Sequence, residues 1–333
     1  MPHFLLLDKL PFMMLPFRQV VESNFDAVNQ SIIEELHSDV GLVEQIGHYL
    51  IDAGGKRLRP LLVLLAAQAC NYSGKTHIQL AVVIEFIHTA TLLHDDVVDT
   101  SEMRRGRFTA NAQWGNPSSV LVGDFLYSRA FQMMVALGDM EIMGILADTT
   151  NIISEGEVQQ LINAGDPDLS EQDYLKVIHC KTAQLFEGAA HAAAVLSKAT
   201  KAQCTAMKSY GYHIGMAFQL VDDALDYQGN AEELGKNIGD DLAEGKSTLP
   251  LIYAMRHGSD EQAQFIRNAI RQRSAEHLES IVKIVNETGA LEATLKTAKE
   301  YVEKAKSSLA NIDSSPYQKA LLQMADFAVS RNH

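Results

Sequence analysis

The sequence predicts an all-α protein that folds as a single domain. Apolar residues recur at helical spacing (i, i+3, i+4, i+7) along almost the whole chain, and nothing shows the sustained alternation of a half-buried strand. The 333 residues include only 8 prolines and no Gly/Ser/Pro-rich linker, and 47% of them are hydrophobic, enough for one large core. We therefore expect one domain of roughly a dozen helices over residues 17–333, with residues 1–16 as a tail that has no predicted place in it.

The apolar periodicity and the positions of Gly and Pro divide the chain into helices. Breaks are expected at Gly54-Gly55, Gly165-Asp166-Pro167 and Gly229-Asn230, among others. Two of the segments, 77–100 and 117–138, are apolar on more than one face, so other helices should surround them. The predicted helices are roughly 18–36, 40–53, 60–72, 77–100, 117–138, 140–164, 171–197, 200–228 and 247–257, with several shorter ones toward the C-terminus.

Composition and charge favour a soluble cytoplasmic protein. The net charge of −14 argues against nucleic acid or anionic lipid as a partner. Three cysteines without a CxxC pair indicate neither a disulfide framework nor a zinc site. No run approaches the ~20 uninterrupted apolar residues that span a bilayer, so we expect no stable membrane insertion. The apolar N-terminus carries Asp8 and lacks a cationic stretch, which favours a flexible tail, or a translation start near Met14, over a cleaved signal.

Two aspartate clusters are the sharpest feature of the sequence. DDVVD (residues 95–99) ends one apolar run, and DDALD (residues 222–226) follows another. The first and last aspartates of each cluster are four residues apart and face the same way on a helix. Like charges at this spacing, beside an apolar stripe, are costly unless a cation compensates them. Carboxylate oxygens suit Mg²⁺ held jointly with a substrate's phosphates, so two such clusters predict several Mg²⁺ ions around a diphosphate.

Dense basic segments stand out in so acidic a chain. GGKRLRP (residues 54–60) and RRGR (residues 104–107) each hold three cations, and single lysines, Lys236 and Lys246, follow glycines after the second cluster. Arginine binds phosphate oxygens bidentately, and lysine acts as a mobile point charge. Together they predict a site for two anionic groups, one bridged by metal ions and one held by Arg and Lys alone.

Several polar residues lie within otherwise apolar helical segments. His88 precedes Asp95 by two helical turns, and Lys181-Thr182 and Gln219 interrupt other apolar runs. Each of them is either a substrate contact or a packed residue whose polar atoms the backbone satisfies. The residues alone leave both interpretations open.

The motifs GGKRLRP, DDVVD followed by MRRG, KTAQLF, GMAFQLVDDALDY, GKN and GKSTLPL occur in this order. Over residues 20–330 they resemble the trans-prenyl diphosphate synthase family, and IEFIHTATLLHDDVVD and SVLVGDFLYSRAFQMM resemble its bacterial octaprenyl-forming members. The resemblance implies a bundle of antiparallel helices around a central cavity, a homodimer, and Mg²⁺-dependent condensation of isopentenyl diphosphate with an allylic diphosphate. The implied primer is farnesyl diphosphate and the implied product an octaprenyl diphosphate for quinone side chains.

The resemblance also implies roles for individual residues. Isopentenyl diphosphate is assigned to Lys56, Arg59, His88 and Arg105. The allylic diphosphate or its cation is assigned to Arg104, Lys181, Thr182, Gln219 and Lys236. Mg²⁺ is assigned to Asp95, Asp99, Asp222 and Asp226, with Asp96 and Asp223 completing the catalytic set.

Product length is expected to depend on the room below the first aspartate cluster. Ala90 lies five residues before Asp95, about 7.5 Å along a helix, with Thr91 beside it. Short-chain relatives usually carry an aromatic residue there as a floor. Small residues predict an open tunnel whose floor comes from neighbouring helices, with Phe131, Met134 and Leu146 as candidates.

Four other functions fit the sequence less well. A class I terpene cyclase normally pairs DDxxD with an Asn/Ser/Glu-type second motif and has no use for a second diphosphate pocket. A ferritin-like di-iron protein needs two Glu-x-x-His motifs, and only Glu85–His88 supplies one. A farnesyl or geranylgeranyl synthase is disfavoured by Ala90 and Thr91. A catalytically inactive partner subunit is disfavoured because both aspartate clusters are intact.

Overall fold

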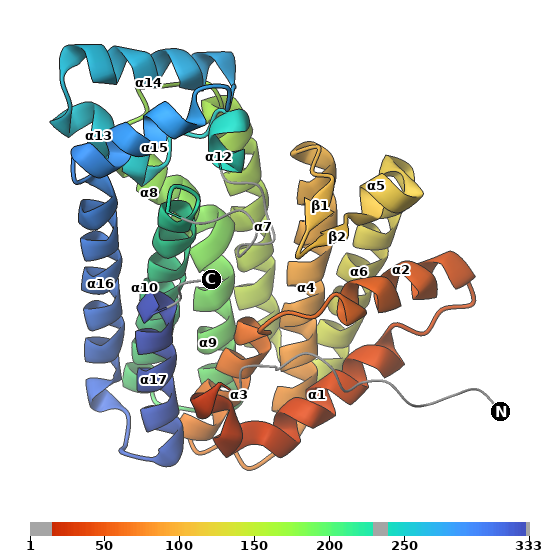
Figure 1. The fold of residues 1–333 in the computed structure, drawn as a ribbon. Coiled ribbons are helices and arrows are strands. Elements are labelled where there is room, and N and C mark those ends of the chain that lie inside the picture. Colours follow the sequence, from red (N-terminus) through yellow and green to blue (C-terminus); the bar gives the residue numbers. More distant parts are fainter. Residues whose placement is uncertain (1–14, 229–238, 331–333) are drawn as a thin grey trace.

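Long helices that lie side by side make up nearly all of the computed structural model, which describes residues 15–228 and 239–330 (Figure 1). The all-α fold class is confirmed. The longer helices are α1 (Glu22–Glu35), α2 (Gly41–Asp52), α3 (Leu58–Ala69), α4 (Thr76–Val98), α6 (Asn116–Leu137), α7 (Met140–Asn163), α9 (Gln184–Leu196), α10 (Lys201–Leu225), α14 (Asp260–Gln272), α16 (Ala290–Ser308) and α17 (Pro316–Ser330). The shorter elements are η1 (Pro16–Val21), β1 (Met103–Arg104), β2 (Arg107–Phe108), α5 (Ala110–Trp114), α8 (Glu171–Ile178), η2 (His179–Ala183), α12 (Asp240–Ala243), α13 (Leu249–His257), α15 (Leu278–Glu287) and η3 (Leu309–Asn311).

Helix α10 joins two groups of buried apolar side chains. Its N-terminal half, including Met207 and Tyr210, belongs to a core shared with α1, α3, α4, α6 and α9. Its C-terminal half, including Met216 and Leu220, belongs to a second core shared with α13, α14 and α16. Because one continuous helix crosses both, this packing favours the single domain predicted for residues 17–333.

Helices α4 and α6 pack against each other, but the prediction that other helices surround both segments holds for α4 and not for α6. Among the described residues, these two are long and apolar enough, by composition alone, to cross a membrane. In α4, 56% of the most apolar stretch is buried inside the protein, as in the core helix of a soluble protein. In α6 that share is 33%, so part of its apolar surface faces outward.

A π-helical turn interrupts the predicted helix 171–197. The helix starts as α8, widens into the π-helix η2, and continues as α9. A π turn closes i→i+5 hydrogen bonds, which shifts the residues in it relative to a regular helix. The shifted residues include Lys181 and Thr182. Helical periodicity does not reveal such a turn, because the apolar pattern before and after it is that of one helix.

A short hairpin follows α4, where only loop was predicted. Arg104 pairs with Arg107, so Arg105 and Gly106 form the two-residue turn. Their φ angles are +53° and +72°, as a type I′ turn requires. Strands of two residues are too short to leave an alternation pattern in the sequence. The hairpin sends the consecutive side chains of Arg104 and Arg105 in different directions.

Other predicted boundaries lie within a few residues of those observed. The helix expected at 200–228 is α10, which begins with a capping box between Thr200 and Gln203. The break expected at Gly229-Asn230 and most of the predicted tail lie outside the described residues. The tail therefore stays a prediction.

Glycines allow α7 and α10 to approach the segment that carries the π turn. A Cβ atom at Gly156 of α7 would lie 2.6 Å from Cys180 Cβ. A Cβ at Gly211 of α10 would lie 2.4 Å from the Phe186 carbonyl oxygen, and one at Gly215 would lie 2.6 Å from Ala183 Cα. Real Cβ atoms do not come so close, so backbone would have to move.

The close approach at Gly211 yields a stability prediction. Gly211→Ala should lower the free energy of unfolding by about 1–3 kcal/mol, since overpacking outweighs the better helix propensity of alanine. Gly144→Ala is the matched control, because Gly144 lies in α7 and a Cβ there would meet nothing within 4 Å. That control should gain up to about 1 kcal/mol. Chemical denaturation measures both, and two equally stabilised variants would contradict the close packing.

Candidate active site

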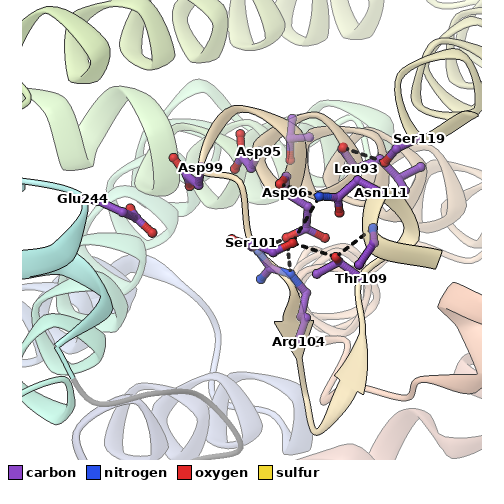
Figure 2. Close-up of polar contacts among 12 residues, drawn as sticks. Leu93, Asp95, Asp96, Asp99, Ser101, Arg104, Thr109, Asn111, Ser119 and Glu244 are labelled. Atoms are coloured by element: carbon purple, nitrogen blue, oxygen red, sulfur yellow. Dashed lines mark hydrogen bonds and ion pairs between the residues drawn. The ribbon is translucent and has the colours of Figure 1, made fainter. Parts of the chain in front are cut away.

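The last turn of α4 directs the three aspartates of the first cluster to two sides (Figure 2). Asp95 and Asp99 point away from the hairpin, and Asp96 points toward it. Asp96 is 2% exposed, and its Oδ1 accepts hydrogen bonds from Arg104 Nε (2.9 Å) and Nη2 (2.7 Å). This buried, charge-assisted pair fixes the position of Arg104. The roles predicted for Asp96 and Arg104 stay predictions, and their contact makes Asp96 an anchor for Arg104.

Side chains from the following segments satisfy the carbonyl groups at the end of α4 (Figure 2). Asn111 Nδ2 donates to the carbonyls of Asp96 and Ser101, at 3.1 Å each. Ser119 Oγ donates to the Leu93 carbonyl at 2.9 Å, and Thr109 Oγ1 donates to Ser101 at 2.7 Å. Because Asn111 lies in α5 and Ser119 lies in α6, these bonds hold the aspartate cluster against both helices.

Lys181, displaced by the π turn, lies beside the first cluster. Its Nζ is 2.6 Å from Glu157 Oε2 of α7 and 3.5 Å from Asp95 Oδ2 of α4. Burial raises the pKa of Glu157 to about 7, and it raises the pKa of Asp95, while Lys181 opposes both shifts. Glu157 was not predicted as a site residue, because one acidic residue on a helix has no distinctive pattern in the sequence.

Lys246 connects the first cluster to the second. Its Nζ is 3.7 Å from Asp99 Oδ2 of α4 and 3.8 Å from Asp241 Oδ1 of α12, and it also contacts Glu244. The backbone N–H of Asp241 in turn donates to Asp226 Oδ2 at 3.3 Å. Asp99, Glu244 and Lys246 line one cavity of about 600 Å³. The structure thus brings together the two clusters, which lie more than a hundred residues apart in the chain.

The aspartates of the second cluster also point in two directions. Asp226 accepts hydrogen bonds from the backbone N–H groups of Gly239 (3.1 Å) and Asp241 (3.3 Å). Burial and the charge of Asp241 raise the pKa of Asp226 to about 8. Asp222 lies in the same turn of α10, within electrostatic reach of Arg59. Asp223 is buried against α8 instead.

The carboxylates fit Mg²⁺ that is shared with a phosphate. Burial disfavours the charged forms of Asp95 and Asp226, and a cation would stabilise those forms. In the described part of the chain, no three His, Cys, Asp or Glu side chains come close enough to hold an ion alone. Mg²⁺ is usually bound by one or two carboxylates with substrate phosphates and water completing its shell. The donors present match that requirement.

A hydrogen-bond chain connects three predicted residues with one that was not predicted. Thr182 Oγ1 donates to Gln219 Oε1 at 2.8 Å, and Gln219 Nε2 donates to Asp223 Oδ1 at 2.7 Å. The hydroxyl of Tyr174 in α8 donates to the other oxygen of Asp223. These four side chains line one pocket together with Lys181 and Lys246.

Arginines and a histidine form a separate cationic pocket. Arg59 Nη1 lies 3.2 Å from His88 Nε2, and its guanidinium lies 4.4 Å from the centre of the Phe186 ring. Burial, assisted by Arg59, lowers the pKa of His88 well below its ordinary value, so the neutral imidazole accepts this hydrogen bond. Burial lowers the pKa of Arg59 to about 10, and its Nε has no hydrogen-bond partner. A buried cation with an unused donor is suited to an anionic ligand.

Arg105 and Lys56 lie on either side of the Gly54-Gly55 turn. Arg105 donates to the Gly54 carbonyl, and Gly55 has a φ of +140°, which L side chains rarely adopt, so glycine is required there. Lys56 Nζ lies 5.1 Å from the ring of Phe327 in α17. Glu85, one turn before His88, lines the same pocket as His88 and Arg105 and was not predicted.

The residues expected to limit product length lie in the core. Ala90 of α4 and Leu146 of α7 are fully buried, and Met134 of α6 is 1% exposed. Phe131 is half-buried, with its ring 5.2 Å from that of Tyr127. Their role stays a prediction, as does that of Lys236, which lies outside the described residues.

Comparison with known proteins identifies the family. Residues 40–288 match the model of the polyprenyl synthetase family. This chain is a polyprenyl synthetase. It is 50% identical to the octaprenyl diphosphate synthase of Escherichia coli over 315 residues, which cover 94% of this chain and 98% of that one. It is 46% identical to the all-trans-nonaprenyl-diphosphate synthase of Rhodobacter capsulatus over 312 residues, which cover 93% and 96%.

Solved structures agree with this assignment. The polyprenyl synthase of Caulobacter crescentus, crystallised with calcium and isoprenyl diphosphate, superposes with a TM-score of 0.92 at 44% identity and covers 95% of this polyprenyl synthetase and 97% of that chain. The decaprenyl diphosphate synthase of Rhodobacter capsulatus superposes with a TM-score of 0.90 at 42% identity and covers 95% and 98%.

Proposed function

We propose that this polyprenyl synthetase condenses isopentenyl diphosphate with an allylic diphosphate, farnesyl diphosphate being the primer, to make a long all-trans polyprenyl diphosphate. The observation that carries the proposal is the pair of aspartate clusters on α4 and α10, connected through Lys246 and Asp241 and lying beside a separate arginine pocket. One region accommodates a diphosphate with its metal ions, and the other accommodates a diphosphate without metal. A reaction that joins two diphosphate substrates requires both.

We assign a separate role in the reaction to each group of residues. Asp95, Asp99, Asp222 and Asp226 would hold Mg²⁺, which would supply positive charge to balance that of the leaving diphosphate. Lys181 and Lys246 add fixed positive charge beside the same oxygens. Arg59, Arg105 and His88 hold isopentenyl diphosphate so that its double bond lies at attacking distance.

The bonds change as follows. The allylic C–O bond breaks, and its electron pair leaves with the diphosphate. The isopentenyl double bond attacks the resulting cation and forms the new C–C bond. Loss of a proton from the adjacent carbon restores a double bond, and the departing diphosphate takes that proton. Thr182 and Gln219 offer oxygen atoms that stabilise the cation between these steps.

We infer that the product is octaprenyl diphosphate, destined for a quinone side chain. The support is the 50% identity to octaprenyl diphosphate synthases of Escherichia coli and Haemophilus influenzae, and the small residue at Ala90. The protein is proposed to act in the cytoplasm without membrane insertion. Its three unpaired cysteines and the packing of α4 against α6 support this.

We also infer a homodimer that associates through α6 and α7. Large apolar side chains are exposed on these helices, and a monomer would leave that surface in water. They are Leu121 and Val135 of α6 and Met140, Val158, Leu161 and Ile162 of α7.

A product assay tests the function. Purified protein with Mg²⁺, farnesyl diphosphate and labelled isopentenyl diphosphate should give a ladder of products that ends at the octaprenyl length by mass spectrometry, and EDTA should abolish it. Asp95→Asn should lower kcat by about 10²–10³, because it removes a charge that binds metal. Asp313→Asn, at an exposed position far along the chain, is the control and should act as wild type. Release of diphosphate from the allylic substrate alone would indicate a cyclase instead.

The tunnel prediction is tested at Ala90. Ala90→Tyr should shorten the main product by several isoprene units, since the ring would project from α4 below Asp95. The product distribution and the melting temperature are measured together. A variant that melts like wild type and still makes octaprenyl diphosphate would show that the chain does not grow past Ala90.

The interface prediction is tested by adding charge. Val135 and Met140 are 67% and 79% exposed, and replacing both with Glu should convert the dimer to a monomer in sedimentation experiments. Val40→Glu is the control, since Val40 is 59% exposed but lies outside α6 and α7. A wild-type monomer at micromolar concentration, or a double variant that stays dimeric, would contradict this interface.

A further inference from the structure

The orientation of the Gln219 amide follows from its neighbours. Gln219 Nε2 donates to Asp223 Oδ1 at 2.7 Å, so the amide nitrogen faces Asp223. The amide oxygen therefore faces the other way, where it accepts from Thr182 at 2.8 Å. This places the carbonyl end of the Gln219 dipole toward the side of the pocket that holds Lys181 and Thr182.

Tyr174 determines how Asp223 lies. Asp223 is 3% exposed and Tyr174 is 4% exposed, so water does not replace a lost hydrogen bond there. The tyrosine hydroxyl donates to Oδ2, which leaves Oδ1 for Gln219. Each oxygen of the carboxylate thus has a donor, one from α8 and one from α10. Without the hydroxyl, Oδ2 would lose this buried donor and the carboxylate would be free to turn toward another one.

The second aspartate of the first cluster acts in a comparable way. Asp96 is buried and holds Arg104 (Figure 2). Asp95 and Asp99 instead lie 3.5 Å and 3.7 Å from the Nζ atoms of Lys181 and Lys246. In each cluster, then, the second aspartate anchors a polar side chain that lies beside the substrate region. For Asp223 the anchored side chain is Gln219, and the residue that steadies the anchor is Tyr174.

We propose that Tyr174 is a positioning residue for the condensation: its hydroxyl fixes Asp223, and Asp223 aims the Gln219 carbonyl at the developing allylic cation. The inference rests on the proposed function. Its effect belongs to the chemical step, because the pocket of Tyr174 and Gln219 shares no lining residue with the pocket of His88 and Arg105. Loss of the hydroxyl should therefore lower kcat and spare the binding of isopentenyl diphosphate.

The test is Tyr174→Phe, which removes one oxygen atom and keeps the ring. We expect kcat to fall about 10-fold, with KM for isopentenyl diphosphate within twofold of wild type. Tyr210→Phe is the matched control. Tyr210 is also a fully buried tyrosine whose hydroxyl makes one hydrogen bond, to the Leu321 carbonyl at 2.6 Å, in the other core. It should leave kcat unchanged.

A double-mutant cycle then asks whether Tyr174 acts through Gln219. In a Gln219→Ala background, Tyr174→Phe should cause no further loss of kcat, since its target is already absent. Additive losses would overturn the inference. So would an active wild type whose kcat is unchanged by Tyr174→Phe, or a variant in which kcat, KM and melting temperature all fail together. A wild type that forms no product overturns the proposed function itself, and the inference with it.

Discussion

The structure depends on keeping carboxylates charged beside apolar helices. The first cluster ends α4, one of the most deeply buried helices, and the second lies near the end of α10. Burial alone would protonate such groups or unfold the segments that carry them. In this protein two lysines, Lys181 and Lys246, reach the first cluster from other elements and supply the opposite charge, and backbone N–H groups bind Asp226 of the second. Substrate-bound metal ions would supply further positive charge to these buried carboxylates. The unfavourable energy of burying the carboxylates would then favour binding of the metal-bound substrate.

This constraint explains several features of the fold that carry no apolar pattern. The π turn brings Lys181 to Asp95 and Glu157, and the glycines of α7 and α10 make room for that turn. The hairpin after α4 brings Arg104 back to Asp96. The short helix α12 and the loop after it bring Lys246 to Asp99. Each irregular element therefore places a cationic side chain beside an aspartate, which the regular helices around it do not do.

The residues within one cluster also differ in their tasks. In the first cluster the first and last aspartates face the lysines, and in both clusters the second aspartate is buried and paired with a side chain of another element. One cluster thus contains two kinds of aspartate, because neighbouring positions on a helix point their side chains in different directions. The pKa of Asp226 near 8 and that of Asp223 near 7 both reflect burial, but their partners are backbone amides in one case and side chains in the other.

The sequence alone determined the helical fold class, most helix boundaries, both aspartate clusters and the basic segments. The helices follow from apolar residues at fixed spacing, because each helix buries its own apolar face, and the charged clusters are visible as short local motifs. Tertiary structure alone decided the rest. Glu157, Glu85 and Tyr174 have no pattern of their own, and they matter only because packing places them beside Lys181, His88 and Asp223. The π turn likewise depends on contacts of α8 and α9 with α7 and α10, since spacing along one helix does not record how closely its neighbours approach.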